Sequence, residues 1–177
     1  MKIQNSIRQT ANKTQNFKAG FTLVESLVAI TIVLISVVGP LSIISKTLSF
    51  GQSARDEIIA FYLAQDAVEY VRNVRDNNLI AGNEWLNGLS ACTLGSLCSV
   101  DSVASAITAC VSSCEPLKLS SSGVYGYTNG TKTQFVREVS LNETVGNREA
   151  TLSVTVRWDQ GLLSRNVALR ERIFNWR

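Results

Sequence analysis

One carboxylate interrupts the most apolar segment of the chain, a few residues after a glycine. Residues 18–26 read KAGFTLVES, in which Gly20 precedes the apolar residues and Glu25 lies among them. A carboxylate costs about 2.5–3.5 kcal/mol at the centre of a bilayer and less near its surface. Glu25 is therefore either a tolerated acid in the first turn of a helix, where the helix dipole favours it, or the partner of a cation inside the membrane.

Four cysteines form a second chemically distinctive group, and all of them follow the apolar segment: Cys92, Cys98, Cys110 and Cys114. An even number of cysteines in an exported region predicts two disulfides, for which three pairings exist. A four-thiolate metal site is an alternative, although its first pair, C-x5-C, is spaced more widely than is usual for such sites. Free thiols are the third interpretation and would fit a reducing exterior.

The chain contains no histidine. This removes the commonest general base, the histidine-activated nucleophiles and the histidine ligand of most catalytic zinc sites. We therefore expect no enzymatic activity, no resident metal and no cofactor. The acids of the later part of the chain show no paired spacing that would indicate a catalytic site: Asp101, Glu115, Glu138, Glu143, Glu149 and Asp159.

The positive charge is concentrated at the N-terminus. Residues 1–20 contain four basic side chains and no acid, and removing these four from the 17 basic residues leaves 13 against 14 acidic ones. The part after Gly20 thus has a net charge of −1. Because no basic surface is expected there, the sequence gives no direct signal for a nucleic-acid partner.

Residues 21–44 form an apolar run of 24 residues, in which Glu25 is the one charged residue. A helix of this length covers about 36 Å, enough for a hydrocarbon core of about 30 Å. The basic residues before it predict a cytoplasmic N-terminus and an extracytoplasmic remainder. A buried core helix would have a polar face, and a cleavable secretory signal would have a shorter apolar run. We therefore expect a single-pass protein of the cytoplasmic membrane, with the lipid bilayer as one partner.

The sequence from Lys18 to Ser26 resembles the processing site of type IV pilins and related pseudopilins, and the resemblance extends to about residue 45. It implies that a prepilin peptidase and N-methyltransferase cuts after Gly20, within the pair Gly20 and Phe21, and then methylates the new amine of Phe21. It also implies that Glu25 is the glutamate used in assembly. The implied partners are other pilin or pseudopilin subunits and an inner-membrane assembly platform.

Cleavage after Gly20 would create an ammonium group at Phe21, at the positive end of the helix dipole, where a cation is poorly placed. Glu25 could neutralise it within the same chain, because residues four apart share a face of a helix. The family resemblance instead implies pairing with the terminus of the preceding subunit. The sequence leaves both pairings open, although only the second makes polymerisation depend on Glu25.

Gly39 and Pro40 interrupt the helical pattern of the apolar run. Proline removes one backbone hydrogen bond and clashes with the preceding turn, which predicts a kink. The resemblance implies that such a proline lets the helix bend or unwind as subunits pack. An ordinary kink without a role in assembly is the alternative.

The chain after the membrane segment predicts a second helix and a sheet. Helical spacing places Ala54, Ile58, Phe61, Val68 and Val71 in one apolar stripe, and Ile59, Leu63, Tyr70 and Val74 in another, with a stop at residues 76–78. Strands are expected at 135–141, 151–158 and 162–174, and a turn at Asn129 and Gly130. Over 151–158 the alternation puts Leu152, Val154, Val156 and Trp158 on one face.

The fold class expected is α+β. A long N-terminal helix, transmembrane in its first half and amphipathic in its second, packs on a C-terminal antiparallel β-meander, which resembles the pilin architecture. In chain order the predicted parts are a basic leader (1–20), a transmembrane and assembly helix (21–45), an amphipathic helix (46–78) and an extracytoplasmic head (79–177), the head comprising a cysteine-containing irregular region (79–131) and an antiparallel sheet (132–177).

The predicted function is that of a structural subunit of a type IV pilus or of a related filament, secretion or DNA-uptake apparatus. A minor pilin or a pseudopilin is favoured, and after assembly the protein would lie in a surface filament. The alternative is a membrane-anchored extracytoplasmic binding module that does not polymerise, in which Glu25 would be incidental.

Overall fold

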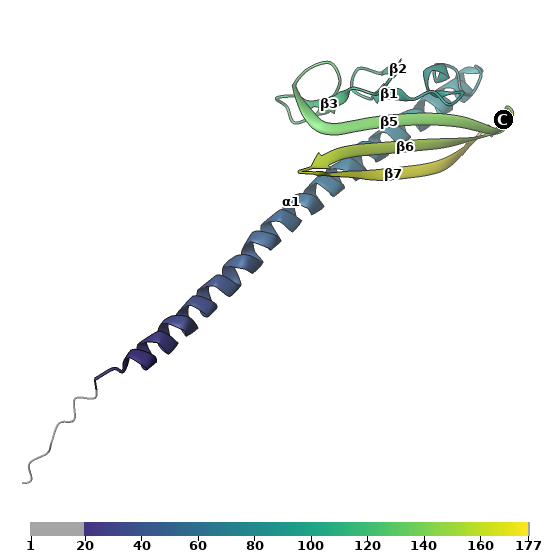
Figure 1. Cartoon of the computed structure of the whole chain (residues 1–177). Coiled ribbons are helices and arrows are strands. Elements are labelled where there is room, and N and C mark those ends of the chain that lie inside the picture. Colours follow the sequence, from purple (N-terminus) through teal and green to yellow (C-terminus); the bar gives the residue numbers. More distant parts are fainter. Residues whose placement is uncertain (1–19, 177) are drawn as a thin grey trace, which may run out of the picture. The chain divides into compact units, whose positions relative to one another are not determined.

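The computed structural model describes residues 20–176 (Figure 1). The chain divides into two compact units, residues 1–47 and 48–177. One long helix is followed by an antiparallel sheet, which confirms the predicted α+β class. In chain order the elements are α1 (Leu23–Ala81), the short 3-10 helix η1 (Ser90–Cys92), β1 (Cys98–Asp101), β2 (Ala106–Ala109), β3 (Pro116–Leu119), β4 (Tyr125–Gly126), β5 (Thr131–Val145), β6 (Glu149–Gln160) and β7 (Leu163–Phe174).

Helix α1 ends at Ala81, three residues later than the sequence pattern indicated. The stop is made by Gly82, whose φ of 81° is the left-handed conformation that glycine adopts without a steric penalty. The amide of Gly82 donates to the carbonyl of Leu79, and the amide of Asn83 donates to that of Asn78. These two bonds are the Schellman pattern, which satisfies carbonyls at the end of a helix.

The last three strands form an antiparallel meander, in which β6 pairs with β5 on one side and with β7 on the other (Figure 1). The β6–β7 turn has two residues, because Gln160 pairs with Leu163. Gly161 has a φ of 63° at the first turn position, where type II′ hairpins favour glycine. The C-terminal antiparallel sheet is therefore confirmed. β5 and β6 are longer than the sequence pattern indicated, and β7 begins one residue later than expected.

Residues 79–131 had been expected to be irregular, but they contain η1 and the strands β1 to β4. All four strands have four residues or fewer, too short for a local pattern to indicate them. The long strand β5 organises them, since its other edge pairs first with β3 and then with β1. Asn129 and Gly130 lie in the connection from β4 to β5 and do not join neighbouring strands, because β3 lies between those two strands.

One face of α1 packs on the sheet, and its centre consists of alanines. Ala60, Ala64 and Ala67 are fully buried, whereas Ile58 and Phe61 of the predicted stripe are exposed. Small side chains let the helix backbone approach the large residues of the sheet closely, so alanines occupy the contact. The predicted inner face of β6 is confirmed, since Leu152, Val154, Val156 and Trp158 are all buried.

A buried arginine links α1 to two strands. Arg137 on β5 is 1% exposed, and its Nη1 donates to the carbonyl oxygen of Leu63 at 2.7 Å and to Asp66 Oδ2 at 2.8 Å. Its Nη2 donates to the carbonyl of Val100 on β1, and its guanidinium carbon lies 6.0 Å from the centre of the Tyr127 ring. One side chain therefore fixes the positions of α1, β1 and β5 relative to one another.

A second ion pair explains an acid on the inner face of β7. Glu171 shares that face with Val167 and Leu169, and it accepts a hydrogen bond from Nε of Arg72 on α1 at 3.0 Å. This hydrogen bond from Arg72 to Glu171 raises the pKa of Arg72. The pair joins α1 to β7, the edge strand of the sheet.

We expect Arg137→Ala to lower the free energy of unfolding by about 3 kcal/mol, because it removes charged hydrogen bonds and leaves the buried carbonyl of Val100 without that donor. The measurement is chemical denaturation of the full-length protein in detergent, followed by the fluorescence of the buried Trp85 and Trp158. The exposed Arg165→Ala is the matched control and should shift stability by less than about 0.5 kcal/mol. Equal midpoints for the two variants would contradict the role assigned to Arg137.

Burial raises the pKa of Tyr127 above its ordinary value, and the positive charge of Arg137 offsets part of that rise. An unfolded tyrosine ionises near pH 10, so above about pH 10 the unfolded state loses this proton before the folded state does. The stability conferred by the neutral phenol is therefore present below pH 10 and lost as pH rises towards the folded pKa. A Tyr127→Phe variant should lose stability less steeply above about pH 10 in the same denaturation measurement, and parallel slopes would contradict this.

Candidate functional site

The predicted cleavage junction lies just before α1, in backbone that is not helical. Gly20 is the first described residue, and both Gly20 and Phe21 are exposed. The basic leader predicted before them lies outside the described residues. An exposed peptide bond outside a helix is one that a peptidase can bind without first unwinding a helix.

Thr22 is a residue whose role sequence analysis missed. Its Oγ1 accepts a hydrogen bond from the backbone amide of Glu25 at 3.2 Å, and its carbonyl accepts one from the amide of Ser26 at 3.1 Å. Thr22 is thus the N-cap of α1, and Glu25 occupies the third helical position. The pattern Thr-x-x-Glu is the signature of a capping box, and this local signal could have located the start of the helix.

The position of Glu25 in the first turn of α1 agrees with the favourable interaction of an acid with the positive end of a helix. Its side chain is exposed, and within residues 20–176 its carboxylate has no ion-pair partner. In the uncut chain the nitrogen of Phe21 belongs to a peptide bond and carries no charge. The terminal ammonium of Phe21 can exist only after cleavage, so the structure leaves both pairings of Glu25 open, within the chain and between subunits.

The first part of α1 exposes apolar side chains all round. From Phe21 to Ile44 every large apolar side chain is more than half exposed, and the helix is long and apolar enough to cross a membrane. The hydroxyls of this part bind backbone carbonyls of the same helix, as Thr31 does with Leu27 at 2.7 Å and Ser42 with Val38 at 3.1 Å. Such internal bonds let an apolar environment surround the helix without leaving these hydroxyls unsatisfied.

The helix runs through Gly39 and Pro40 without interruption. Pro40 has no amide hydrogen to donate to the carbonyl of residue 36. A Cβ at Gly39 would meet no other atom within 4 Å, so Gly39 leaves an open notch on the helix surface. The kink expected at these two residues stays a prediction.

The four cysteines form two disulfides, Cys92–Cys98 and Cys110–Cys114, which confirms the predicted oxidation and selects one of the three pairings. The thiolate metal site and the free thiols are therefore wrong. Within the described residues no group of three or more metal-ligating side chains is placed to hold an ion. The sequence could not choose the pairing, because the spacing alone allows all three, and the structure shows that each bridge joins cysteines only six or four residues apart.

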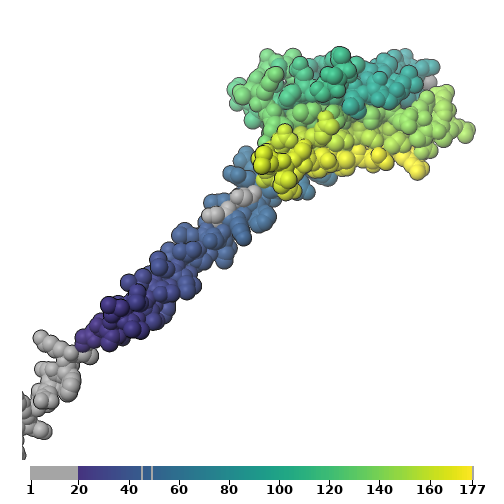
Figure 2. Space-filling model, in the orientation of Figure 1, coloured from purple at the N-terminus to yellow at the C-terminus, as the bar shows by residue number. Residues whose placement is uncertain are grey.

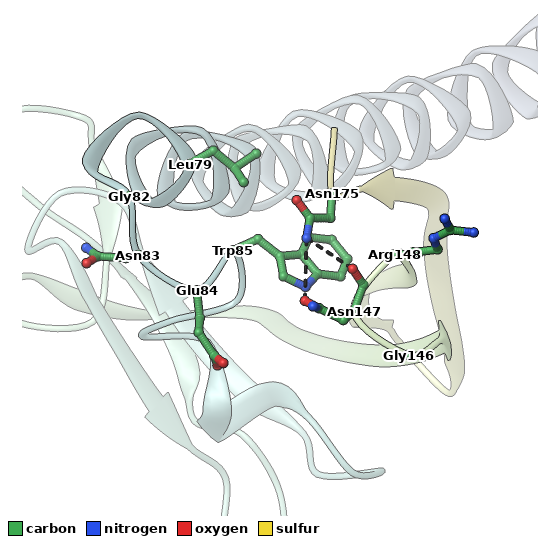
Figure 3. Close-up of a pocket in the computed structure, with 9 residues that line it drawn as sticks. All are labelled: Leu79, Gly82, Asn83, Glu84, Trp85, Gly146, Asn147, Arg148 and Asn175. Atoms are coloured by element: carbon green, nitrogen blue, oxygen red, sulfur yellow. Dashed lines mark hydrogen bonds between the residues drawn. The ribbon is translucent and has the colours of Figure 1, made fainter. Parts of the chain in front are cut away.

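An open polar pocket of about 550 Å³ lies between the end of α1, the β5–β6 turn and the end of the chain (Figure 3). Asn175 donates from Nδ2 to the carbonyl oxygen of Asn147 at 3.0 Å, and its backbone amide donates to the carbonyl of Arg148 at 2.9 Å. Trp85 lies beside this pair and is buried. These bonds hold the C-terminal residues against the turn, and the arrangement shows no nucleophile paired with a base.

Comparison with known proteins finds a match for the N-terminal segment. The model of the prokaryotic N-terminal methylation motif matches residues 15–39, the segment that contains Gly20, Phe21 and Glu25. No curated protein and no solved structure gives a significant match to the chain. The chain thus carries the N-terminal methylation motif, the signal of type IV pilins, at the start of a long apolar helix that leads into an antiparallel sheet.

Proposed function

We propose that this protein is a structural subunit of a type IV pilus or of a related filament, secretion or DNA-uptake apparatus. It is made as a precursor, cut after Gly20 and methylated at Phe21 by a prepilin peptidase. The observation that carries the proposal is the methylation motif at residues 15–39. The exposed, non-helical junction before the capped start of α1 supports it.

The proposed topology follows from the charge and the apolar helix. Residues 21–44 anchor the protein in the cytoplasmic membrane, the four basic side chains of the leader keep the N-terminus in the cytoplasm, and the disulfide-containing head lies outside. Disulfides persist in oxidising exteriors and are rare in the cytosol, so they support this orientation. The partners are the peptidase, the assembly platform and neighbouring pilin or pseudopilin subunits.

In the proposed assembly step, Glu25 neutralises the methylated amine of Phe21 on a neighbouring subunit. Lipid penalises both charges when they are alone, so each lowers the cost of the other. The carboxylate is exposed and without an ion-pair partner in the described chain, and is therefore free to pair between subunits. We favour a minor pilin or a pseudopilin, with a structural and not a catalytic role.

Processing is tested by the mass of the protein from host cells with and without the prepilin peptidase. Cells with the enzyme should yield a chain that begins at Phe21 and carries one added methyl group, and cells without it the full precursor. Gly20→Val should block the cut, because glycine has no side chain and a branched one would obstruct the approach of the peptidase to the backbone. Ala19→Ser should be cut normally. An identical mass in both strains would refute the processing step.

Assembly is tested with Glu25→Gln, which keeps the size of the side chain and removes its charge. Incorporation into filaments should fall by at least about tenfold, since an unpaired charge costs about 2.5–3.5 kcal/mol within a bilayer and about 1.4 kcal/mol corresponds to a factor of ten. Sheared filaments and membranes are assayed by immunoblot for this subunit. Glu25→Asp should keep part of the function, and Ser26→Ala is the neighbouring control.

The same assay separates assembly from the alternative of a binding module that does not polymerise. On that alternative, the surface level of filaments is equal for Glu25→Gln and Ser26→Ala. The mass of each variant is measured in parallel, so that a block in cleavage is not mistaken for a block in incorporation. Normal cleavage combined with unchanged incorporation of Glu25→Gln would exclude the proposed pairing.

A further inference from the structure

The β6–β7 hairpin ends in two leucines that the head does not bury. Gly161 and Leu162 form its two-residue turn, and Leu163 begins β7. Leu162 is 105% exposed and Leu163 is 64% exposed. A glycine followed by Asn, Asp or Ser is the usual sequence of such a turn, so a polar residue at position 162 would satisfy the fold. Single exposed apolar residues are common on protein surfaces, but these two are consecutive and form one apolar tip.

The tip of this hairpin lies beside α1. Ser53 Oγ on α1 donates to Gln160 Oε1 at 3.0 Å, and Figure 2 shows the hairpin tip, in yellow, against the blue part of the helix. Gln160 pairs directly with Leu163 across the hairpin, so their side chains lie on the same face of the sheet. Leu163 is therefore on the helix side of the hairpin, at the end of the head where Ser53 lies.

A third exposed apolar side chain follows from the helix itself. Phe50 lies three residues before Ser53, on the same face of α1 and about one turn earlier. Its side chain is 73% exposed, and side chains of a helix lean towards its N-terminus, away from the sheet. We call Phe50, Leu162 and Leu163 the tip cluster. All three belong to the unit formed by residues 48–177.

The tip cluster is close in the chain to the apolar run. That run ends at Ile44, and Phe50 follows six residues later in the same helix, which corresponds to about 9 Å along the axis. The headgroup layer on each side of a bilayer is about 5–8 Å thick. The chain therefore keeps Phe50 near the surface of any bilayer that the run spans, and the bond between Ser53 and Gln160 keeps the two leucines near Phe50.

The charges around the tip cluster nearly cancel. Asp159 and Arg165, both exposed, lie three residues before and three residues after Leu162. Three further charged residues follow Phe50 on α1: Arg55, Asp56 and Glu57. Two basic and three acidic side chains give no excess of positive charge that would attract anionic lipid. At about 3.3 Å per residue, Asp159 and Arg165 lie about 10 Å from Leu162 along their strands, so the leucines can enter an apolar layer while these charges stay outside it.

We propose that the tip cluster inserts into the surface of the bilayer that residues 21–44 span, as a second attachment of the head. The partner is the boundary between the headgroups and acyl chains of phospholipid, which apolar side chains recognise without needing lipid charge. Three side chains are too few for a stable protein interface, which takes about 20–30 residues on each side. A bilayer does not require that area, because α1 already holds the cluster at the surface and makes insertion an intramolecular step.

This inference rests on the membrane anchor of the proposed function and adds an orientation to it. A head attached through one helix can rotate about that helix and tilt, whereas a second contact with the bilayer restrains both motions. Shallow insertion of a few apolar groups is weak and reversible. The head can therefore leave the surface when the subunit is taken out of the membrane.

The test uses the full-length chain in vesicles of phosphatidylcholine, with an environment-sensitive fluorescent amino acid at one position at a time. At Leu162 we expect a blue-shifted emission that is quenched by phosphatidylcholine brominated near the start of its acyl chains. Leu94 is the matched control, because it is 97% exposed but lies in the loop closed by Cys92 and Cys98, and it should show neither effect. A probe at Val33, within the apolar run, should be quenched by deeply brominated lipid and reports the anchor.

A substitution then tests whether the apolar side chains cause the insertion. Leu163→Asp in the chain labelled at residue 162 should abolish the quenching, because a carboxylate would have to enter the apolar layer. Asn166→Asp adds the same charge to β7 at an exposed position, about 13 Å along the strand from Leu162. The quenching should persist in that variant.

The outcomes separate the tip contact from the anchor on which it rests. Quenching at Val33 without quenching at residue 162 would overturn the tip contact and leave the anchor in place, whereas no quenching at either position would refute both. A blue shift at residue 162 that brominated lipid does not quench would mean that a second copy of the chain covers the cluster, which also overturns the contact with lipid. Equal quenching at residues 94 and 162, or equal effects of Leu163→Asp and Asn166→Asp, would contradict an insertion confined to the tip. The vesicles contain no peptidase and no other subunit, so none of these results depends on processing or on filament assembly.

Discussion

A single helix has to satisfy two different environments along its length, and the composition of α1 changes accordingly. Up to Ile44 its large apolar side chains are exposed on every side, and its hydroxyls are bonded to its own carbonyls. From Ala60 onwards one face is buried against the sheet and the opposite face is polar or exposed. The helix therefore needs a surrounding that is apolar in the first part and a folded head in the second.

The attachment of the head to α1 combines close packing with a few buried polar bonds. Alanines bring the helix near the sheet, and large residues of β6, Trp158 among them, pack in the same core. Arg137 then crosses the contact and binds backbone groups of α1 and β1. Apolar packing is not directional, whereas hydrogen bonds are, so the arginine adds a defined register to a contact that packing alone would allow to slide.

The N-terminal segment and the head differ in the features that they expose. The N-terminal segment contains an exposed acid at the start of an apolar helix, a combination that makes sense when a cation can approach it. The head contains two disulfides, and the short loops that they close hold Leu94 and Val111 exposed.

What the sequence by itself determined is whatever depends on neighbours along the chain. The junction at Gly20 and Phe21, the spacing to Glu25, the apolar run and the alternation of β6 are local patterns, and so is the Thr22 cap that could also have been found from its spacing. Only the tertiary structure decided the disulfide pairing, the burial of Ala60 and Ala64, the partners of Arg137 and the pairing of β1 and β3 with β5. The last three features join residues far apart in the chain, and their energies arise from distances that no periodicity in the sequence specifies. The disulfides join cysteines only six and four residues apart, but they are one of three pairings that the spacing alone allows.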